Sequence, residues 1–266
     1  MRIEMDVRLD PTLGCGQAHR WFKDGGTWHG VLGSNPVALT QTDDGFDCSG
    51  NIGRFEIEDY FRPEDDLCEI MSHISECDPH VARLSAACPG LRILRQEKWE
   101  CLATYLLATN ANVKRIGQMV ESVCETFGDD LGGRCAFPSP SQILDRRDLI
   151  RACKLGFREG RFLKLAERVE NNEIDLDSIS GMEYEKCAAT LMEIDGVGPK
   201  VADCVSLFAF GHLVAFPVDA RISKCMEELY GVTGSYRAVS GYGMARFGKY
   251  AGYAQELLYH RDHVKV

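Results

Sequence analysis

The chain has 266 residues, of which 45% are hydrophobic and 26% charged, and its formal net charge at pH 7 is −10. This composition excludes a disordered chain, a collagen-like fibre and a small disulfide scaffold, and it allows one large domain or two modest ones. The longest mostly apolar stretch, residues 205–218, is interrupted by Gly211 and Pro217 and is too short to cross a membrane. The N-terminal segment has no uninterrupted hydrophobic run. We therefore expect no signal peptide and an intracellular, cytoplasmic protein, associated with the nucleoid in a prokaryote.

The pattern of apolar residues changes about a quarter of the way along the chain. Short runs such as 37–41 and the Gly-containing segment 21–28 predict antiparallel strands and a hairpin. From about Asp65 the apolar residues recur at helical spacing. We expect an α+β protein with an antiparallel β-rich domain over residues 1–90 and an α-helical body over residues 91–266. Helices are predicted at 65–76, 80–87, 97–109, 112–127, 139–144, 146–153, 158–171, 183–192, 199–210, 218–229 and 244–259, with breaks at Gly and Pro clusters such as Gly241-Tyr242-Gly243.

The spacing of the cysteines and the net charge limit which metals, cofactors and partners the protein is expected to bind. Twelve cysteines are scattered and no two form a C-x-x-C pair, so we expect free thiols in a reducing compartment and no metal site. The acidic net charge argues against a nucleic-acid partner. However, residues 92–164 carry thirteen basic against nine acidic side chains, so a basic face remains possible.

The segment Gly196-Val197-Gly198 is the most informative part of the chain. Two glycines around one apolar residue are typical of a tight turn between helices, with Val197 facing inward and both glycines free to adopt positive φ. Pro199 suits the first turn of the next helix, whose unpaired N–H groups provide a site for a DNA phosphate. The pattern resembles the helix-hairpin-helix DNA-binding motif, over about residues 183–210. The alternative is a Gly-rich turn that only joins two helices.

Lys200 and Asp219 follow this turn. A lysine at a helix start is disfavoured by the helix dipole, and an unfavourable site lowers an amine's pKa and makes it nucleophilic. Asp219 ends the segment Pro217-Val218-Asp219 at the start of another predicted helix. Taken separately, a surface lysine and an N-cap aspartate are the simpler interpretations. Together, after a helix-hairpin-helix, the two residues resemble the signature of DNA glycosylases that carry a Schiff-base lysine.

Further segments resemble the 8-oxoguanine DNA glycosylases of the helix-hairpin-helix superfamily. The matches run in order from about residue 9 to residue 259. They include Gly16-Gln17, Arg20-Trp21, Leu39-Thr40-Gln41-Thr42, Arg115-Ile116, Phe137-Pro138-Ser139, Leu155-Gly156-Phe157-Arg158 and Tyr250-Ala251-Gly252-Tyr253-Ala254-Gln255. The resemblance implies an N-terminal antiparallel β-sheet domain followed by an all-α helix-hairpin-helix glycosylase body.

The resemblance also implies an activity, a bifunctional DNA glycosylase/AP lyase of base excision repair. In this family the lysine, here Lys200, attacks C1′ of a flipped 8-oxoguanine nucleotide opposite cytosine, forms a Schiff base and nicks the strand by β-elimination. Asp219 would stabilise the oxocarbenium character at the sugar, as carboxylates do in glycoside cleavage. The implied partner is double-stranded DNA containing 8-oxoguanine, with no cofactor, metal or membrane, and the protein is expected to be a monomer.

The same resemblance assigns the base-binding residues. The carbonyl of Gly16 would accept the N7–H that 8-oxoguanine has and guanine lacks. Cys204 and Tyr259 would cover the two faces of the base, although phenylalanine is common in place of Tyr259, and Gln255 would bond the pairing edge. A strand-entry turn, a core cysteine, a helix-end tyrosine and a surface glutamine are the respective alternatives.

By resemblance the DNA-contacting residues are Asn110, Asn112, Arg115, Phe157, Arg158, Gly196, Gly198 and Arg221. Asn110, Arg115 and Arg158 would fill the vacated stack and contact the orphaned cytosine. Phe157 stands in place of the family's usual tyrosine wedge, and Arg221 in place of a phosphate-contacting histidine. A solvated helix face is the alternative for Arg115 and Arg158.

Three other functions remain as alternatives. An endonuclease III-like enzyme for oxidised pyrimidines shares the lysine and aspartate but usually carries a four-cysteine cluster, which is missing here. Glycosylases for alkylated bases generally lack the lysine. A non-catalytic helix-hairpin-helix module would bind DNA without using Lys200 and Asp219.

Overall fold

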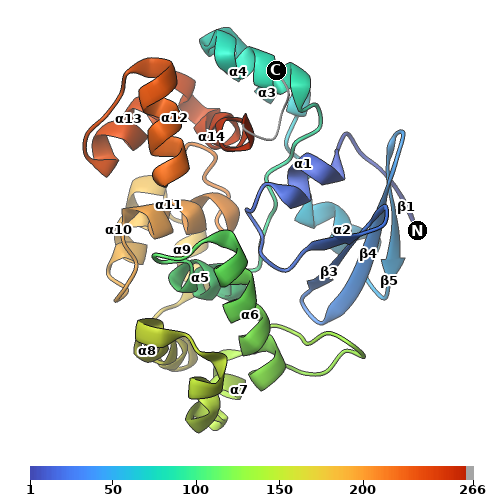
Figure 1. Ribbon diagram of the computed structural model, residues 1–266, viewed down its shortest axis with the longest axis vertical. Helices are drawn as coiled ribbons and strands as arrows, with labels where there is room; N and C mark the ends of the chain where they lie inside the picture. Colours follow the sequence, from blue (N-terminus) through green and yellow to red (C-terminus); the bar gives the residue numbers. More distant parts are fainter. Residues whose placement is uncertain (262–266) are drawn as a thin grey trace.

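The computed structural model describes residues 1–261, and its N-terminal part is a five-stranded antiparallel sheet (Figure 1). The strand order is β1-β5-β4-β3-β2. The strands are β1 (Arg2–Glu4), β2 (Phe22–Asp24), β3 (Thr27–Leu32), β4 (Asn35–Thr42) and β5 (Gly45–Gly50). The hairpin predicted at 21–28 is present, because Asp24 pairs with Thr27 across Gly25-Gly26. Its turn places Gly25 at φ 59, where a glycine has no steric cost.

One face of the sheet is covered by two short helices, α1 (Leu9–Gly14) and α2 (Arg54–Tyr60) (Figure 1). Alternate residues of β4, Val37 and Leu39, are buried as the period of a strand requires. The rings of Phe46 and Phe61 pack with their centroids 4.9 Å apart in the same apolar cluster. Neither helix is among the predicted ones, since the apolar residues of segments this short give only a weak periodic signal.

The rest of the described chain is helical. Its α-helices are α3 (Leu67–Cys77), α4 (Pro79–Ala87), α5 (Lys98–Leu107), α6 (Val113–Phe127), α7 (Pro140–Asp145), α8 (Glu159–Glu170), α9 (Leu176–Ser180), α10 (Tyr184–Met192), α11 (Pro199–Phe208), α12 (Ala220–Tyr230), α13 (Tyr236–Phe247) and α14 (Ala251–His260). The 3-10 helices are η1 (Arg147–Cys153), η2 (Gly156–Arg158) and η3 (Gly248–Tyr250). The predicted α+β class, with the sheet first and the helical body after it, is confirmed.

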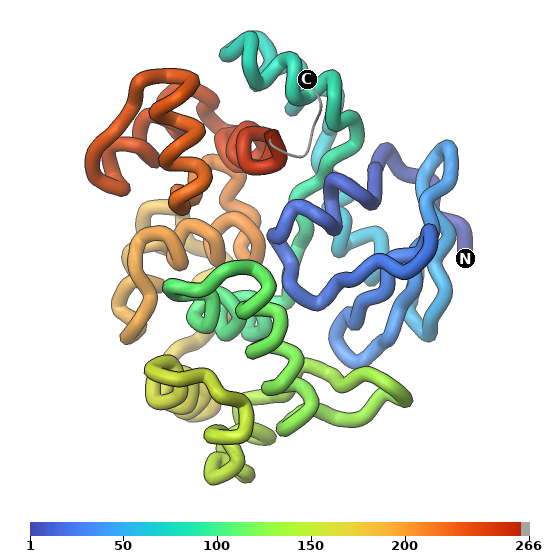
Figure 2. Tube along the Cα trace, in the orientation of Figure 1, coloured from blue at the N-terminus to red at the C-terminus, as the bar shows by residue number. Residues whose placement is uncertain are grey.

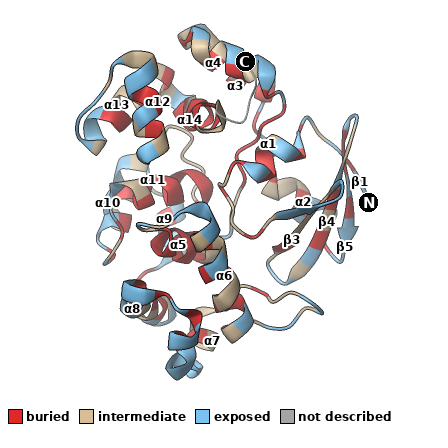
Figure 3. Ribbon diagram, in the orientation of Figure 1, coloured by how far each residue is buried: buried red, intermediate tan, exposed pale blue. Residues whose placement is uncertain are grey.

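Three central helices, α5, α11 and α14, are buried on nearly every side (Figure 3). A helix that is apolar all round lies in the core of a protein and is held rigidly by its neighbours. Helices α3 and α4 precede the predicted domain boundary at residue 90, yet they pack against α13 and α14 (Figure 2). That boundary stays a prediction.

Two predicted elements differ from the structure. Residues 244–259 do not form one helix, because α13 ends at Phe247 and Gly248 has a φ of 61 before α14 begins. Gly241-Tyr242-Gly243, predicted as a break, lies inside α13 instead. The reason is packing, since a Cβ at Gly243 would lie 2.6 Å from the ring of Phe216, which occupies that space. Residues 147–153 are a 3-10 helix rather than an α-helix.

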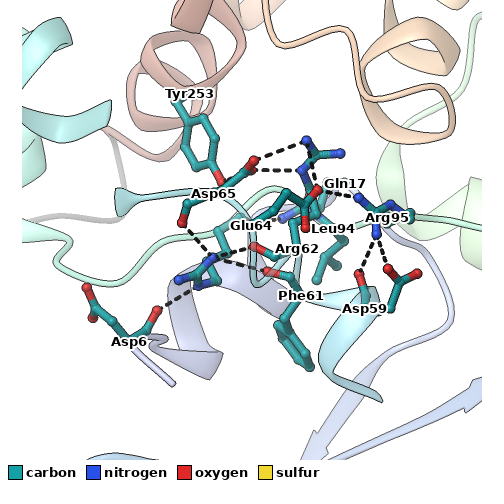
Figure 4. A network of polar contacts seen from close by, with 11 residues as sticks. Asp6, Gln17, Asp59, Phe61, Arg62, Glu64, Asp65, Leu94, Arg95 and Tyr253 are labelled. Atoms are coloured by element: carbon teal, nitrogen blue, oxygen red, sulfur yellow. Dashed lines mark hydrogen bonds and ion pairs between the residues drawn. The ribbon is translucent and has the colours of Figure 1, made fainter. Parts of the chain in front are cut away.

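Buried arginines join the sheet to the helical body (Figure 4). Arg92 donates to the backbone carbonyls of Asp6 and Arg62, both at 2.7 Å. Arg62 pairs with Asp65 at 2.8 Å, and the hydroxyl of Tyr253 on α14 donates to the same carboxylate at 2.7 Å. Because a buried charge without its partner is costly, this network holds α14 in a defined position relative to the N-terminal domain.

All twelve cysteines are free thiols, most of them buried. Within residues 1–261 no cluster of histidine, cysteine or acidic side chains has the arrangement of a metal site. In the same range, none of the helices has the length and hydropathy needed to span a membrane.

Candidate active site

The predicted hairpin lies between α10 and α11. Val197 is 6% exposed, which confirms that it faces inward, and Gly196 has the expected positive φ of 90. The same expectation for Gly198 is wrong, because its φ is −93 and its ψ is 179. Gly198 is the N-cap of α11, and its carbonyl accepts from the N–H of Ala202 at 3.0 Å. Since glycine has no side chain to cap the helix, the first N–H groups of α11 are left for an external acceptor.

We expect replacement of Gly196 and of Gly198 by alanine to affect stability differently. A Cβ at Gly196 would lie 2.7 Å from Cδ of Arg161 and 2.9 Å from Cδ1 of Leu106, in addition to the strain of its positive φ. We expect Gly196→Ala to lower the free energy of unfolding by about 1–3 kcal/mol. A Cβ at Gly198 would lie in open space, so Gly198→Ala is expected to change the free energy of unfolding by less than about 1 kcal/mol. Urea denaturation of the two variants measures this difference, and equal losses would contradict it.

Lys200 and Asp219 line one cavity of about 100 Å³. The predicted base-binding residues, Gly16, Cys204, Gln255 and Tyr259, line the same cavity. These six residues come from the turn after α1, from α11, from the start of α12 and from α14. The structure therefore brings together every residue that the sequence analysis assigned to catalysis and base binding.

Lys200 lies in the first turn of α11, against an aromatic ring. Its Nζ is 5.5 Å from the ring centroid of Tyr105 on α5, within the range of a cation–π contact. The hydroxyl of Tyr105 donates to the carbonyl of Gln17 at 3.0 Å, so the ring is fixed from the other side. Tyr105 thus connects the position of Lys200 to the turn that carries Gly16.

Asp219 is an N-cap, as one of the two interpretations predicted. Its carboxylate accepts from the N–H of Ile222 at 2.8 Å and so holds the start of α12. It also lines the cavity beside Lys200, so the capping and catalytic interpretations do not exclude each other. The N–H of Val218, the preceding residue, donates to the hydroxyl of Tyr236 at 3.4 Å.

A buried carboxylate lies on the same helix as Lys200 and joins α11 to its neighbours. Asp203, also on α11, accepts hydrogen bonds from the hydroxyls of Tyr184, Tyr236 and Ser240. These partners lie on α10 and α13, so the network ties three helices together. Burial raises the pKa of Asp203, while the three hydroxyls lower it. The sequence analysis did not find this role, because the partners are distant in the chain.

The turn that carries Gly16 is rigid because Gln17 is fully hydrogen-bonded. The Gln17 amide nitrogen donates to the carbonyls of Thr12 and Arg92, both at 2.9 Å. Its oxygen accepts from the N–H of Leu94 at 2.8 Å (Figure 4). Gly16 itself has a φ of 90, a conformation that glycine adopts without strain. Gly16 is therefore held in a defined backbone conformation in the lining of the cavity.

The walls of the cavity include the side chains of Cys204, Gln255 and Tyr259. Burial raises the pKa of Cys204 to about 12, so it stays a neutral thiol. Gln255 is 4% exposed, which excludes a surface glutamine, and its Oε1 has no hydrogen-bond partner among the described residues. The guanidinium of Arg221 lies 4.7 Å from the ring centroid of Tyr259 and donates to that residue's carbonyl at 3.3 Å.

Two of the three arginines predicted to contact DNA, Arg115 and Arg158, also hold backbone turns. Arg158 is buried and donates to the carbonyls of Thr109 and Leu155, which excludes a solvated helix face for it. Arg115 is partly exposed and donates to the carbonyl of Lys154. Together they tie the turn between α5 and α6 to the 3-10 segment before α8.

The remaining predicted DNA contacts lie at exposed tips of these turns. Asn110 is exposed with a φ of 52, and Asn112 is exposed and caps α6 by accepting from the N–H of Arg115 at 2.9 Å. Phe157 is 59% exposed, an unusual position for a large apolar ring. The guanidinium of Arg158 lies 4.3 Å from the centroid of this ring and supports it.

Two residues of the cavity were missed by the sequence analysis. His19 and Glu256 line it together with Lys200. Burial and the nearby charge of Lys200 lower the pKa of His19 to about 4, so its imidazole is neutral at pH 7. Glu256 is a charged residue inside the otherwise apolar stretch of α14, and that contrast was visible in the sequence.

Comparisons with known proteins agree with this geometry. Residues 2–102 match the family model of the 8-oxoguanine DNA glycosylase N-terminal domain. The N-glycosylase/DNA lyase OGG1 of Arabidopsis thaliana is 31% identical over 291 aligned positions, which cover 96% of this chain and 77% of that protein. A probable N-glycosylase/DNA lyase of Methanothermobacter thermautotrophicus is 29% identical over 64% of this chain and 62% of that protein.

A solved structure resembles the whole fold. It is the Clostridium acetobutylicum 8-oxoguanine glycosylase/lyase in complex with double-stranded DNA that contains cytosine opposite 8-oxoG. Its TM-score to this structure is 0.91 at 28% sequence identity, over 98% of this chain and 93% of that chain. With its helix-hairpin-helix, its cavity and these relatives, the chain belongs to the 8-oxoguanine DNA glycosylase/lyases, the DNA repair enzymes of the helix-hairpin-helix superfamily.

Proposed function

We propose that this DNA glycosylase/lyase excises 8-oxoguanine paired with cytosine through a Schiff base on Lys200 and then nicks the strand. The observation that carries the proposal is the shared cavity. Its walls hold an amine, a carboxylate, a fixed backbone carbonyl and the side chains of Cys204 and Tyr259 for the faces of a base. At about 100 Å³ the cavity is confined, and burial of the flipped base there excludes water from the reaction.

The chemistry follows from the groups in the cavity. The neutral amine of Lys200 attacks C1′, the bond from C1′ to N9 breaks, and its electron pair leaves with the base. Asp219 stabilises the positive charge that develops at the sugar in this step. The amine adduct then opens the sugar to a Schiff base, and loss of a C2′ proton expels the 3′ phosphate.

Discrimination against guanine depends on one proton. The N7–H of 8-oxoguanine donates to the carbonyl of Gly16, whereas the N7 of guanine is an acceptor and would face that oxygen without a hydrogen bond. Because two acceptors would face each other in the complex with guanine, such a site discriminates strongly in favour of 8-oxoguanine. The Oε1 of Gln255, which has no hydrogen-bond partner within residues 1–261, supports a second contact, with a donor on the pairing edge of the base.

The opposite base is read outside the cavity. The guanidinium of Arg158 lies against the exposed ring of Phe157, and Arg158 donates to the carbonyl of Thr109, the residue before Asn110. Arg115 donates to the carbonyl of Lys154, three residues before Phe157. In the proposed complex the ring of Phe157 enters the stack when the damaged nucleotide leaves it. Guanidinium and amide donors match the acceptors of an orphaned cytosine, and the Clostridium relative was solved with cytosine opposite the lesion. We also propose that the protein acts on DNA as a monomer, because the cavity is complete within one chain.

The proposed function is tested with duplexes that contain one 8-oxoguanine opposite cytosine, adenine, guanine or thymine. We expect the wild type to release the base about 5- to 150-fold faster opposite cytosine, since one lost bidentate contact costs about 1–3 kcal/mol. Borohydride is expected to trap a covalent complex with the same duplex. Absence of base release from all four duplexes would overturn the proposal.

Replacement of Phe157 by alanine tests the proposed wedge. Because the ring is exposed, we expect the free energy of unfolding to change by less than about 0.5 kcal/mol. The single-turnover rate of excision is expected to fall about 5- to 100-fold, since stacking of a base on an aromatic ring is worth about 1–3 kcal/mol. Phe55→Ala is the matched control, because Phe55 is 79% exposed on α2. Equal rates for both variants would refute the wedge.

A further inference from the structure

Glu256 is a second carboxylate in the catalytic cavity, beside Asp219, and none of the roles described above uses it. It is 4% exposed, it follows Gln255 directly on α14, and it lines the cavity with Lys200. Its Oε2 is buried without a hydrogen-bond partner among the described residues. A buried polar atom with no partner, inside a site that binds a polar base, marks a contact that forms only when the ligand is present.

The surroundings of Glu256 come from several elements. They are Cys15 after α1, Asp219 at the start of α12, Cys204 on α11, Tyr105 on α5 and Tyr259 on α14 itself. Burial raises the pKa of Glu256 to about 7, the thiol of Cys15 lowers it, and the charge of Asp219 raises it further. Helices α3, α4 and α13 also pack against α14, and no group on them contributes to this pKa.

The other groups of the cavity whose pKa values are shifted are poorly suited to transfer a proton at neutral pH. The pKa of His19 is lowered to about 4, and the pKa values of Cys204 and Tyr259 are raised to about 12. A general acid or base works best when its pKa lies near the working pH. Among these groups Glu256 alone meets that condition.

We propose that Glu256 is the general acid of base release, a role that rests on the proposed function of this cavity. As the bond from C1′ to N9 breaks and the bond from C1′ to Nζ of Lys200 forms, the carboxyl group of Glu256 gives its proton to the departing base, which leaves neutral. The resulting carboxylate then takes one proton from the secondary ammonium formed on Lys200. This returns Glu256 to its acid form and leaves a neutral amine adduct, which opens to the Schiff base.

The test compares two substrates, because an abasic site has no base to release. Single-turnover rates are measured from pH 5.5 to 9 on a duplex with 8-oxoguanine opposite cytosine and on the same duplex with an abasic site. For the wild type we expect base excision to decline as the pH rises through about 7, since the acid form of Glu256 is lost there. Strand nicking at the abasic site is expected to lack this decline.

The variant Glu256→Gln keeps the size of the side chain but removes its proton. We expect base excision to fall about 100-fold or more at pH 6 and its decline above pH 7 to disappear. Nicking at the abasic site is expected to fall less than tenfold. An equal loss on both substrates, or an unchanged decline with pH, would overturn the proposal and leave Glu256 a structural residue. Failure of the wild type to excise 8-oxoguanine would instead overturn the proposed function.

Thermal unfolding shows whether the variant is folded and whether Glu256 is buried as an acid. A pKa raised from 4.5 to about 7 means that the folded state binds more protons than the unfolded state in that window. The wild type therefore loses stability as the pH rises from 4.5 to 7, whereas Glu256→Gln does not. We expect the Tm of the variant, relative to that of the wild type, to rise across this range. If the variant does not fold, the two wild-type pH profiles decide the proposal.

Discussion

Lys200→Gln is expected to reduce the rate of 8-oxoguanine excision by at least about a thousandfold, because it removes the nucleophile that forms the covalent intermediate. The borohydride-trapped complex is expected to disappear with it. Glutamine preserves the aliphatic stem against Tyr105, so the fold and the affinity for DNA should persist. Single-turnover excision, trapping and DNA binding by fluorescence anisotropy measure the three quantities on one duplex.

Lys224→Gln provides the matched control for this variant. The Lys224 side chain is 74% exposed and pairs only loosely with Glu228, at 3.6 Å, so a change of charge there should leave catalysis intact. Continued release of the free base by Lys200→Gln would show that water, activated by Asp219, replaces the amine. Continued trapping by this variant would show that another amine forms the Schiff base.

Asp219→Asn is expected to lower the excision rate about 100- to 1,000-fold with little change in Tm. The amide oxygen of asparagine can still accept the hydrogen bond from Ile222 and cap α12, but it carries no charge to stabilise the sugar. Asp219→Ala removes the cap as well, which should cost about 1 kcal/mol of stability in addition. Comparison of the two variants by kinetics and urea denaturation separates the catalytic role from the capping role.

Asp175→Asn is the control for the effect of an amide at an N-cap. The carboxylate of Asp175 caps α9 by accepting from the N–H groups of Asp177 and Ser178, both at 3.0 Å, and it lies outside the cavity. The variant Asp175→Asn should change the excision rate by less than twofold. A similar loss of activity at both positions would mean that Asp219 acts through the fold and not on the sugar.

The position of the site follows from how the three central helices are packed. Because α5, α11 and α14 are buried on nearly every side, their side chains cannot shift without repacking of the core. Lys200, Gln255 and Glu256 are therefore held in place before DNA binds. Such preorganised groups stabilise a transition state without reorganisation during the reaction.

Local patterns in the sequence predicted much of the fold. The hairpin at 21–28, the helix-hairpin-helix and most of the helices were correct, because strand and helix periods are set by neighbouring residues. The short helices α1, α2 and α9 were missed, because so few residues give a weak periodic signal. The helical break was placed at Gly241-Tyr242-Gly243 instead of Gly248, because the packing of Phe216 against Gly243 involves residues far apart in the chain.

The sequence by itself determined the family, the turn expected to bind phosphate and the set of residues expected in the site, because motif spacing and residue type are local properties. Only the tertiary structure decided that Asp219 both caps α12 and lines the cavity, and that Arg158 is buried. It also showed that the side-chain oxygen of Gln255 has no hydrogen-bond partner in the described part of the chain. It also placed Glu256 among these residues, with a pKa raised to about 7. Burial and electrostatic environment depend on segments that meet only after folding, and no local pattern records them.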